Sequence, residues 1–197
     1  YTFNGWYTAT SGGTLLTATT KVTSTRTYYA QWTINRTVTF NANGGNAPSF
    51  ATKAVKSGTA LGTLPTISRT GHTHTGWYTA TSGGTKIATT TVISANVNYY
   101  AQWTANSYTF TFHANGGGTP SSATLTRTYN TNIGTLPTIS RTGYTHNGWW
   151  TSSAASGGTQ LTTTTKVTTN VNYYARWTIN SYKFTFNANG GGTPSSA

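Results

Sequence analysis

Aromatic and threonine residues alternate along several short stretches of the chain. In residues 107–113, Tyr108, Phe110 and Phe112 alternate with two threonines, and residues 97–103 place an apolar or aromatic residue at every second position. A period of two is typical of a strand with one buried face. Stretches rich in glycine and asparagine separate these segments and favour turns. The pattern predicts a mainly β architecture, with room for a short helical turn in the threonine-rich stretches.

Several phrases of the sequence recur with a period of about 72 residues. Gly-Trp and Tyr-Ala-x-Trp each occur three times, and they end at Trp6, Trp77 and Trp149 and at Trp32, Trp103 and Trp177. Tandem similarity at a fixed period indicates a repeat architecture. Because a tryptophan side chain buries a large apolar area, these six residues are predicted to form the structural core, two in each copy.

The phase of the repeat divides the chain into four parts. We expect complete repeats at residues 36–104 and 107–178, the C-terminal part of a repeat at 1–33, and the N-terminal part of a further repeat at 181–197. Since the chain has no Met, we interpret it as a window onto a longer array. Connections of about two residues limit relative motion, so the expected architecture is a row of small domains that forms an elongated rod.

A glycine pair follows the first predicted strand of each copy, in the phrases "NANGG", "HANGG" and "NANGG". Glycine accepts a positive φ without steric cost, which tight turns often require. The predicted turn glycines are Gly44, Gly45, Gly116, Gly117, Gly190 and Gly191.

The chain contains no Asp and no Glu, while 12 Lys and Arg residues give it a net charge of +12. A chain of ordinary composition would carry roughly two dozen acidic residues at this length. Three explanations stay open at this stage. The first is a protein that functions in acid, and the second is a protein that binds polyanions. The third, which we favour, is a sequence in which acidic residues were recorded as Asn, Ser, Thr or Ala. The 12 cations never cluster and lack aromatic–basic interleaving, so we expect no nucleic-acid partner.

The residue types argue against catalysis and against a cofactor or metal. No Cys is present, and without carboxylates no acid–base pair or hard-cation site forms. His72 and His74 lie two residues apart on one predicted strand and could chelate a metal. We favour a packing role, because the first copy has Tyr1 and Phe3 at the matching positions. No apolar run reaches the roughly 20 residues of a membrane span.

Trp150 is the candidate for an exposed ligand contact. It stands beside Trp149, whereas the matching positions in the other copies hold Tyr7 and Tyr78. A pair of tryptophans would suit a carbohydrate platform. The favoured alternative places Trp149 in the core and Trp150 on the opposite, half-exposed face of the strand.

The chain resembles the Listeria–Bacteroides repeat, the B-repeat family of internalin-type surface proteins. The matching phrases are "TFNANGG" at Thr39–Gly45, "RTGYTHNGWW" at Arg141–Trp150, "SGGT" at Ser82–Thr85 and "YAQW" at Tyr29–Trp32. The resemblance implies a small β-grasp-like domain repeated along bacterial cell-surface proteins, with a role in adhesion or spacing.

We therefore expect a structural stalk or filament on a bacterial cell surface, outside the cell, acting as a spacer or adhesion fibre. Its expected partners are neighbouring repeats or copies of the same chain. The alternative is a binding module for carbohydrate or a polyanionic surface polymer.

Overall fold

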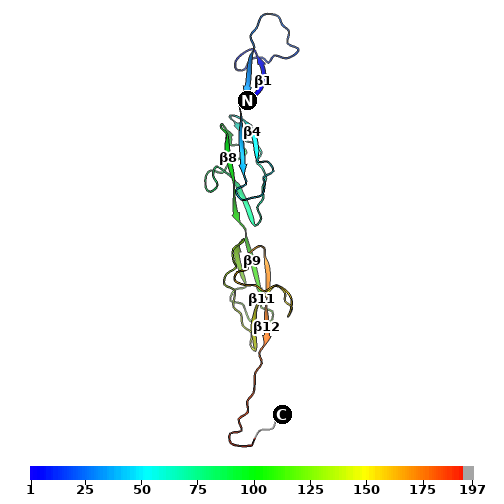
Figure 1. Ribbon diagram of the computed structural model, residues 1–197, viewed down its shortest axis with the longest axis vertical. Coiled ribbons are helices and arrows are strands. Elements are labelled where there is room, and N and C mark those ends of the chain that lie inside the picture. Colours follow the sequence, from blue (N-terminus) through cyan, green and yellow to red (C-terminus); the bar gives the residue numbers. More distant parts are fainter. Residues whose placement is uncertain (193–197) are drawn as a thin grey trace. The chain divides into compact units, whose positions relative to one another are not determined.

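A computed structural model describes residues 1–192 of the chain, which divides into two units at Ala105 and Asn106. Figure 1 shows that both are built from strands. Residues 1–192 contain no helix, so the prediction of a mainly β fold is confirmed.

The predicted helical turn in the threonine-rich stretches is wrong for the described residues. There the backbone makes single turns, in which Thr91 N donates to Ala88 O at 3.0 Å and Ala88 N donates to Thr91 Oγ1 at 2.9 Å. The same pair of bonds joins Thr162 and Thr165. A threonine hydroxyl competes with the backbone carbonyls of a helix for N–H groups. This competition explains why these stretches form single turns and not helices.

The first unit begins with a two-stranded sheet and continues with a four-stranded one. The first sheet pairs β1 (Thr2–Tyr7) with β2 (Tyr29–Thr33). The second has the order β4-β3-β8-β6, with bounds Thr52–Lys56, Asn35–Asn41, Val97–Ala105 and His72–Tyr78. Its two central strands, β3 and β8, are parallel, and both outer pairings are antiparallel. A small sheet pairs β5 (Thr59–Ala60) with β7 (Val92–Ile93).

The second unit repeats the four-stranded sheet. Its order is β10-β9-β12-β11, with bounds Thr124–Thr128, Ser107–His113, Val171–Ile179 and Tyr144–Trp150. Again the two central strands are parallel, and β9, β11 and β12 can be followed in Figure 1. Alternate residues of β9 enter the core, where Phe110 and Phe112 are 1% and 4% exposed, as the alternating pattern predicts.

The strand that carries the Gly-Trp phrase has an irregular register in all three copies. The shift in pairing falls at or beside Gly5, Gly76 and Gly148, which have positive φ values of 128°, 137° and 91°. A residue from the following loop covers each glycine. At Gly76 an added Cβ would lie 2.4 Å from Lys86 Cε. The glycine therefore supplies both the bulge conformation and the space for that side chain.

Candidate functional site

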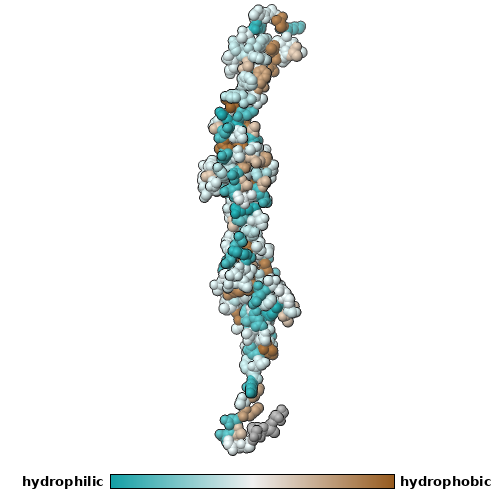
Figure 2. All heavy atoms as spheres, viewed as in Figure 1, coloured by the Kyte–Doolittle hydropathy of each residue, from teal (hydrophilic) through white to brown (hydrophobic). Residues whose placement is uncertain are grey.

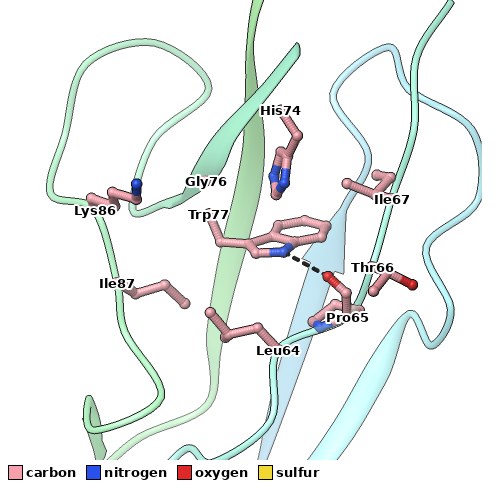
Figure 3. A pocket seen from close by; sticks show the side chains of 9 residues that line it. All are labelled: Leu64, Pro65, Thr66, Ile67, His74, Gly76, Trp77, Lys86 and Ile87. Carbon is pink, nitrogen blue, oxygen red and sulfur yellow. Dashed lines mark hydrogen bonds between the residues drawn. The ribbon is translucent and has the colours of Figure 1, made fainter.

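Trp77 and Trp149 are the centres of the two cores. Each is 1% exposed. Trp77 Nε1 donates to Pro65 O at 3.1 Å, and Trp149 Nε1 donates to Pro137 O at 2.8 Å. Figure 3 shows the bond in the first unit. A buried indole N–H needs such a partner, so the proline carbonyl fixes how deeply the ring enters the core.

The second tryptophan of each complete copy covers the glycine pair. Trp103 and Trp177 are partly buried and pack against the two cores. Trp103 Nε1 donates to Ala42 O and Trp177 Nε1 to Ala114 O, both at 3.1 Å. These bonds link β8 and β12, which carry the two tryptophans, to the turns that follow β3 and β9.

The two glycines of each turn are needed for different reasons. Gly44 has a φ of 85°, which a residue with a side chain rarely adopts. Gly45 has no positive φ, but a Cβ added there would lie 2.3 Å from Trp103 Cζ2. Gly116 (φ 87°) and Gly117 (2.3 Å from Trp177 Cζ2) repeat this division. The sequence predicted turn glycines but not the ring that rests on the second one.

The third glycine pair has the same backbone bend without a ring above it. Gly190 has a φ of 86°, and a Cβ at Gly191 would meet Ala188 O at 3.2 Å.

A third aromatic ring lies between the two tryptophans of each complete copy. The centroid of His74 is 5.4 Å from that of Trp77 and 5.1 Å from that of Trp103. Its Nε2 atom is buried without a hydrogen-bond partner. Burial lowers the pKa of His74; a backbone hydrogen bond with Gly76 opposes this shift, and the charge of Lys86 adds to it.

His146 repeats this arrangement in the second unit, 5.2 Å from both Trp149 and Trp177. Burial again lowers the pKa of the imidazole, against a backbone hydrogen bond with Gly148 that raises it. In the first copy Phe3 fills the slot, 5.8 Å from Trp6 and 5.1 Å from Trp32. The slot therefore holds an imidazole in two copies and a phenyl ring in the other, which indicates a packing requirement.

The two histidines suggested as a chelating pair have different surroundings. His74 lies against tryptophans, while His72 Nδ1 lies 2.9 Å from Thr70 O. Among residues 1–192, no three His, Cys, Asp or Glu side chains gather around a point where a metal ion could sit.

Trp6 and Trp32 depart from the predicted core role. They are 49% and 56% exposed. The reason is local: their sheet contains only β1 and β2, so the strand that covers Trp77 and Trp103 in the complete sheet has no counterpart here. The pair still makes its ring contacts with Phe3.

The loop after the Gly-Trp strand is held by one side chain in each copy. Gln31 Nε2 donates to Ala9 O and Gly12 O at 2.9 and 2.7 Å. Gln102 Nε2 makes the same bonds to Ala80 O and Gly83 O. In the third copy Arg176 takes this position, and its guanidinium donates to Ala154 O and Gly157 O at 3.2 and 2.7 Å. The longer side chain suits a loop that is two residues longer.

Trp150 completes this loop support in the second unit. It is half-buried, and the guanidinium carbon of Arg176 lies 3.9 Å from its ring centroid. Trp150 Nε1 donates to Asn147 O at 3.0 Å. The predicted contact residue thus stacks on the cation that holds the loop, and its indole N–H is already used.

Asn43 links the turn to the same loop. It has a φ of 46°, and its Nδ2 donates to Thr81 O and to Ala101 O, both at 2.9 Å. Asn115 has a φ of 47° and makes the equivalent bonds to Ser153 O and Ala175 O. The asparagine of the "NANGG" phrase is therefore a connector between three segments, a role that its position in a turn did not indicate.

A hollow of about 340 Å³ lies beside Trp77 in the first unit. Figure 3 shows Leu64, Ile67 and Ile87 around the ring, with Lys86 at one side. The lining is mainly apolar and belongs to the core wall, so the hollow offers a ligand little beyond the Lys86 amine for specific recognition.

Four basic side chains in residues 1–192, Lys53, Arg127, Lys166 and Arg176, donate to backbone carbonyls. Lys53 Nζ donates to Leu61 O at 2.7 Å and to Thr63 O at 3.1 Å, and Arg127 Nε donates to Ile133 O at 3.0 Å. In a chain without carboxylates, carbonyl oxygens take the place of ion-pair partners. No helix in residues 1–192 is long and apolar enough to cross a membrane.

Several bacterial proteins are similar to this chain. Internalin H of Listeria monocytogenes is 41% identical over 111 residues, which are 54% of this chain and 20% of that protein. In Evansella cellulosilytica, a putative membrane protein is 31% identical over 84% of the chain, and a putative Gly-rich membrane protein is 30% identical over 96% of it. The chain spans about a fifth to a quarter of the length of these relatives. No solved structure matches it significantly.

The model of the Listeria–Bacteroides repeat domain matches residues 1–31, 37–102 and 108–176. The three matches cover most of the chain; each contains one Gly-Trp phrase and ends one residue before the tryptophan of a Tyr-Ala-x-Trp phrase. The chain therefore belongs to the Listeria–Bacteroides repeat family.

Proposed function

We propose that the chain is a section of a structural stalk on a bacterial cell surface, where it acts as a spacer or adhesion fibre and not as an enzyme. The observation that carries this proposal is the shortness of the joints. One residue, Asn106, separates β8 from β9, and one residue, Ile34, separates β2 from β3. A strand that passes almost without interruption from one repeat into the next leaves little freedom at the joint.

Backbone hydrogen bonds tie each joint residue to the repeat that follows it. The carbonyl oxygens of Ile34 and Asn106 each accept a backbone N–H, from Ser57 and Tyr129 respectively, at 2.7 Å. Asn35 Nδ2 also donates to Thr2 Oγ1 at 2.8 Å. The proposed rod requires that each repeat adds a set increment of length.

We further propose that each repeat is a helix-free variant of the β-grasp arrangement. The order β4-β3-β8-β6, with its parallel central pair, supports this assignment. The connection between β4 and β6, where a crossover helix would lie, consists of residues 57–71 and carries Leu61 and Leu64 toward the core. A rod needs only that each sheet be stable by itself, so the lost helix does not oppose the proposed function.

The surface location rests on the relatives. One is an internalin, and two are described as membrane proteins. Antibodies against residues 36–104 should label intact, unpermeabilised cells of the bacterium that encodes the chain. Labelling only after permeabilisation would contradict this part of the proposal.

Small-angle X-ray scattering tests the spacer role. Chains with one and two extra copies of residues 107–178 should lengthen by an equal increment per copy. A matched control carries a flexible Gly-Ser insertion after Asn106, and its maximum dimension should become broadly distributed. If the uninterrupted chain already scatters like beads on a flexible string, the spacer proposal is wrong.

A second candidate function is binding of carbohydrate or an anionic surface polymer. It is favoured by the stack of Arg176 on Trp150, which occurs in only one of the three copies within residues 1–192. Titration with a teichoic-acid-like polymer at rising salt tests it, since binding through cations weakens with salt. An unchanged affinity in a Trp150→Tyr variant, which copies Tyr78, would exclude a role for the stack.

A further inference from the structure

Arg69 and Arg141 stand at the same position of the two complete repeats, in the phrase "SRTG" that both repeats contain. They differ from the other arginines of the chain in how their guanidinium groups are used. Each of the others donates to a hydroxyl or a backbone carbonyl of the protein; these are Arg26, Arg36, Arg127 and Arg176. Within residues 1–192, the guanidinium nitrogens of Arg69 and Arg141 donate to no protein acceptor. Their planar forks of N–H donors are therefore free to bind a group from outside the chain.

The turn glycines place both guanidinium groups. A Cβ added at Gly116 would lie 3.2 Å from Arg141 Nη1 and 3.4 Å from its Cζ. At Gly44 the corresponding distances to Arg69 are 3.4 and 3.5 Å. Each guanidinium thus lies over the backbone of a glycine, in space that a larger residue would need for its own side chain.

An aromatic ring also holds the arginine of the second unit. The guanidinium carbon of Arg141 lies 3.7 Å from the ring centroid of Tyr144, a cation–π contact. Arg69 and Arg141 are both partly buried. Because folding already restricts these long side chains, a ligand that binds them has less side-chain entropy to remove.

The free forks call for an oxyanion that the chain itself lacks. A guanidinium pairs with a carboxylate or a phosphate through two parallel N–H bonds. The chain has no Asp or Glu side chain to supply such a group, and its net charge of +12 attracts anions from solution.

The residues beside the two arginines favour a sugar-based ligand. Each arginine is flanked in sequence by two exposed hydroxyl residues, which are Ser68, Thr70, Ser140 and Thr142. A hydroxyl both donates and accepts hydrogen bonds, so it can bind the hydroxyls of a sugar. The centre of a protein–protein interface is instead built on aromatic anchors and on residues that exclude water.

We propose that Arg69 and Arg141 bind the oxyanions of an anionic glycopolymer, with one site in each complete repeat. The oxyanion is a sugar carboxylate or a phosphodiester, since both fit the fork. Figure 2 shows hydrophilic residues in several places on the visible face of both units. A ligand with one anion gains little from sites that are spread in this way, whereas a polymer engages several repeats at once.

This inference goes beyond the stalk role. It rests on the second candidate function for the class of ligand, and it assigns recognition to residues other than Arg176 and Trp150. Scattering measurements on the arginine variants below keep the two roles apart, because the maximum dimension of these variants should equal that of the parent whether or not they bind a polymer.

Affinity for two defined polymers tests the sites. Polygalacturonate carries carboxylates and polyglycerol phosphate carries phosphodiesters, so the polymer that binds identifies the oxyanion. Arg69→Gln together with Arg141→Gln should weaken binding about tenfold or more, since bonds between charged groups are lost in both repeats. The matched control, Lys56→Gln with Lys166→Gln, removes the same charge from exposed positions of the two units and should bind nearly as the parent does. Absence of binding to both polymers, or equal losses in the two variants, would overturn the proposal.

Replacement by lysine separates the fork from the charge. Arg69→Lys with Arg141→Lys keeps both charges but removes the planar pair of donors, so this variant should bind several-fold more weakly than the parent. If it binds as tightly as the parent, charge alone is recognised and the fork has no role.

Chemical modification of the parent chain gives a readout that needs no variant. Phenylglyoxal reacts with accessible guanidinium groups, and mass spectrometry measures the reaction at each arginine. Polymer should protect Arg69 and Arg141, while Arg36 and Arg127 provide internal references. Protection of Arg176 alone would support the second candidate function and contradict this inference. If polyglutamate protects the two arginines and neither glycopolymer does, the ligand is an acidic protein and the proposal is wrong.

Discussion

The edge strands β4 and β10 carry the same two residue classes in opposite order, and this exchange yields a sharp prediction. β4 has Lys53 followed by buried Val55, while β10 has Leu125 followed by Arg127 at the matching positions. At these two positions, each edge strand thus has one aliphatic side chain and one cation. The cations donate to the carbonyls of Leu61 and Ile133, which are also at matching positions.

The perturbation is to give β10 the order of β4 through Leu125→Lys and Arg127→Val. Arg127→Val alone removes the bond to Ile133 O. Such a bond to a charged group is worth about 1.5–3 kcal/mol, which solvent at this half-buried edge reduces to about 1 kcal/mol. Leu125→Lys alone costs about 1 kcal/mol, because a lysine stem recovers only part of the lost apolar contact.

The double variant should be nearly as stable as the parent. Its new lysine can reach Ile133 O, as Lys53 Nζ reaches Leu61 O at 2.7 Å, and its new valine fills the place that Val55 fills in the first unit. The coupling energy is therefore expected to be about 1–2 kcal/mol, close to the sum of the two single losses.

Hydrogen exchange followed by mass spectrometry measures this energy in the full chain. Protection of β9 and β12 amides should fall about fivefold in each single variant, since 1.4 kcal/mol corresponds to tenfold, and should return in the double variant. Amides of β3 and β8 provide an internal reference. As a contrasting control, the reverse exchange in β4 should not be rescued, because its new arginine at position 55 would stand opposite Arg36.

Additive losses of about 2 kcal/mol in the β10 double variant would refute the reasoning. They would mean that the two positions act independently, and that the shared carbonyl acceptor does not explain the exchanged order.

Three further predictions follow from the turn and the ring slot. Burial lowers the folded-state pKa of His74 and His146. In the unfolded chain these histidines have a pKa of about 6.5, so they take up protons at a higher pH than in the folded chain. The free energy of unfolding should therefore have its full value above that pH and should fall as the pH is lowered, until the lower folded-state pKa is reached. Thermal unfolding between pH 7 and 5 should depend less on pH in the variant His74→Phe with His146→Phe. Gly45→Ala should cost about 2 kcal/mol or more in urea unfolding, since its Cβ would overlap Trp103. Asn43→Ala should cost about 2–3 kcal/mol in the same assay, because two backbone acceptors lose their donor and a positive φ is left to a residue that avoids it.

Strands and core centres could be predicted because their signals are local or periodic. Alternation in residues 107–113 reports the buried face of β9 directly. The repeat of Gly-Trp every 71 or 72 residues marks a fixed structural position whatever its fold. Two members of that set, Trp77 and Trp149, are 1% exposed.

The roles that sequence reasoning missed all depend on contacts between distant segments. Gln102 holds a loop 19 and 22 residues away, and Asn43 reaches 38 and 58 residues along the chain. A signal was present for the first of these: Gln31 and Gln102 become Arg176 in the one copy whose loop is longer. The exposure of Trp6 carried no local signal, since its phrase is the same as that around the buried Trp77.

The absence of carboxylates changes what acid does to such a domain. Ordinary proteins lose stability in acid mainly because carboxylates that are paired in the folded state become protonated. Here Lys53 and Arg127 donate to backbone carbonyls, which do not titrate. With no Asp or Glu and four His, the summed charge of the side chains rises by at most four as pH falls. The ring slot occupied by His74 and His146 is then the principal acid-sensitive feature of the two complete repeats, and below the folded-state pKa of these histidines stability should reach a plateau and not continue to fall.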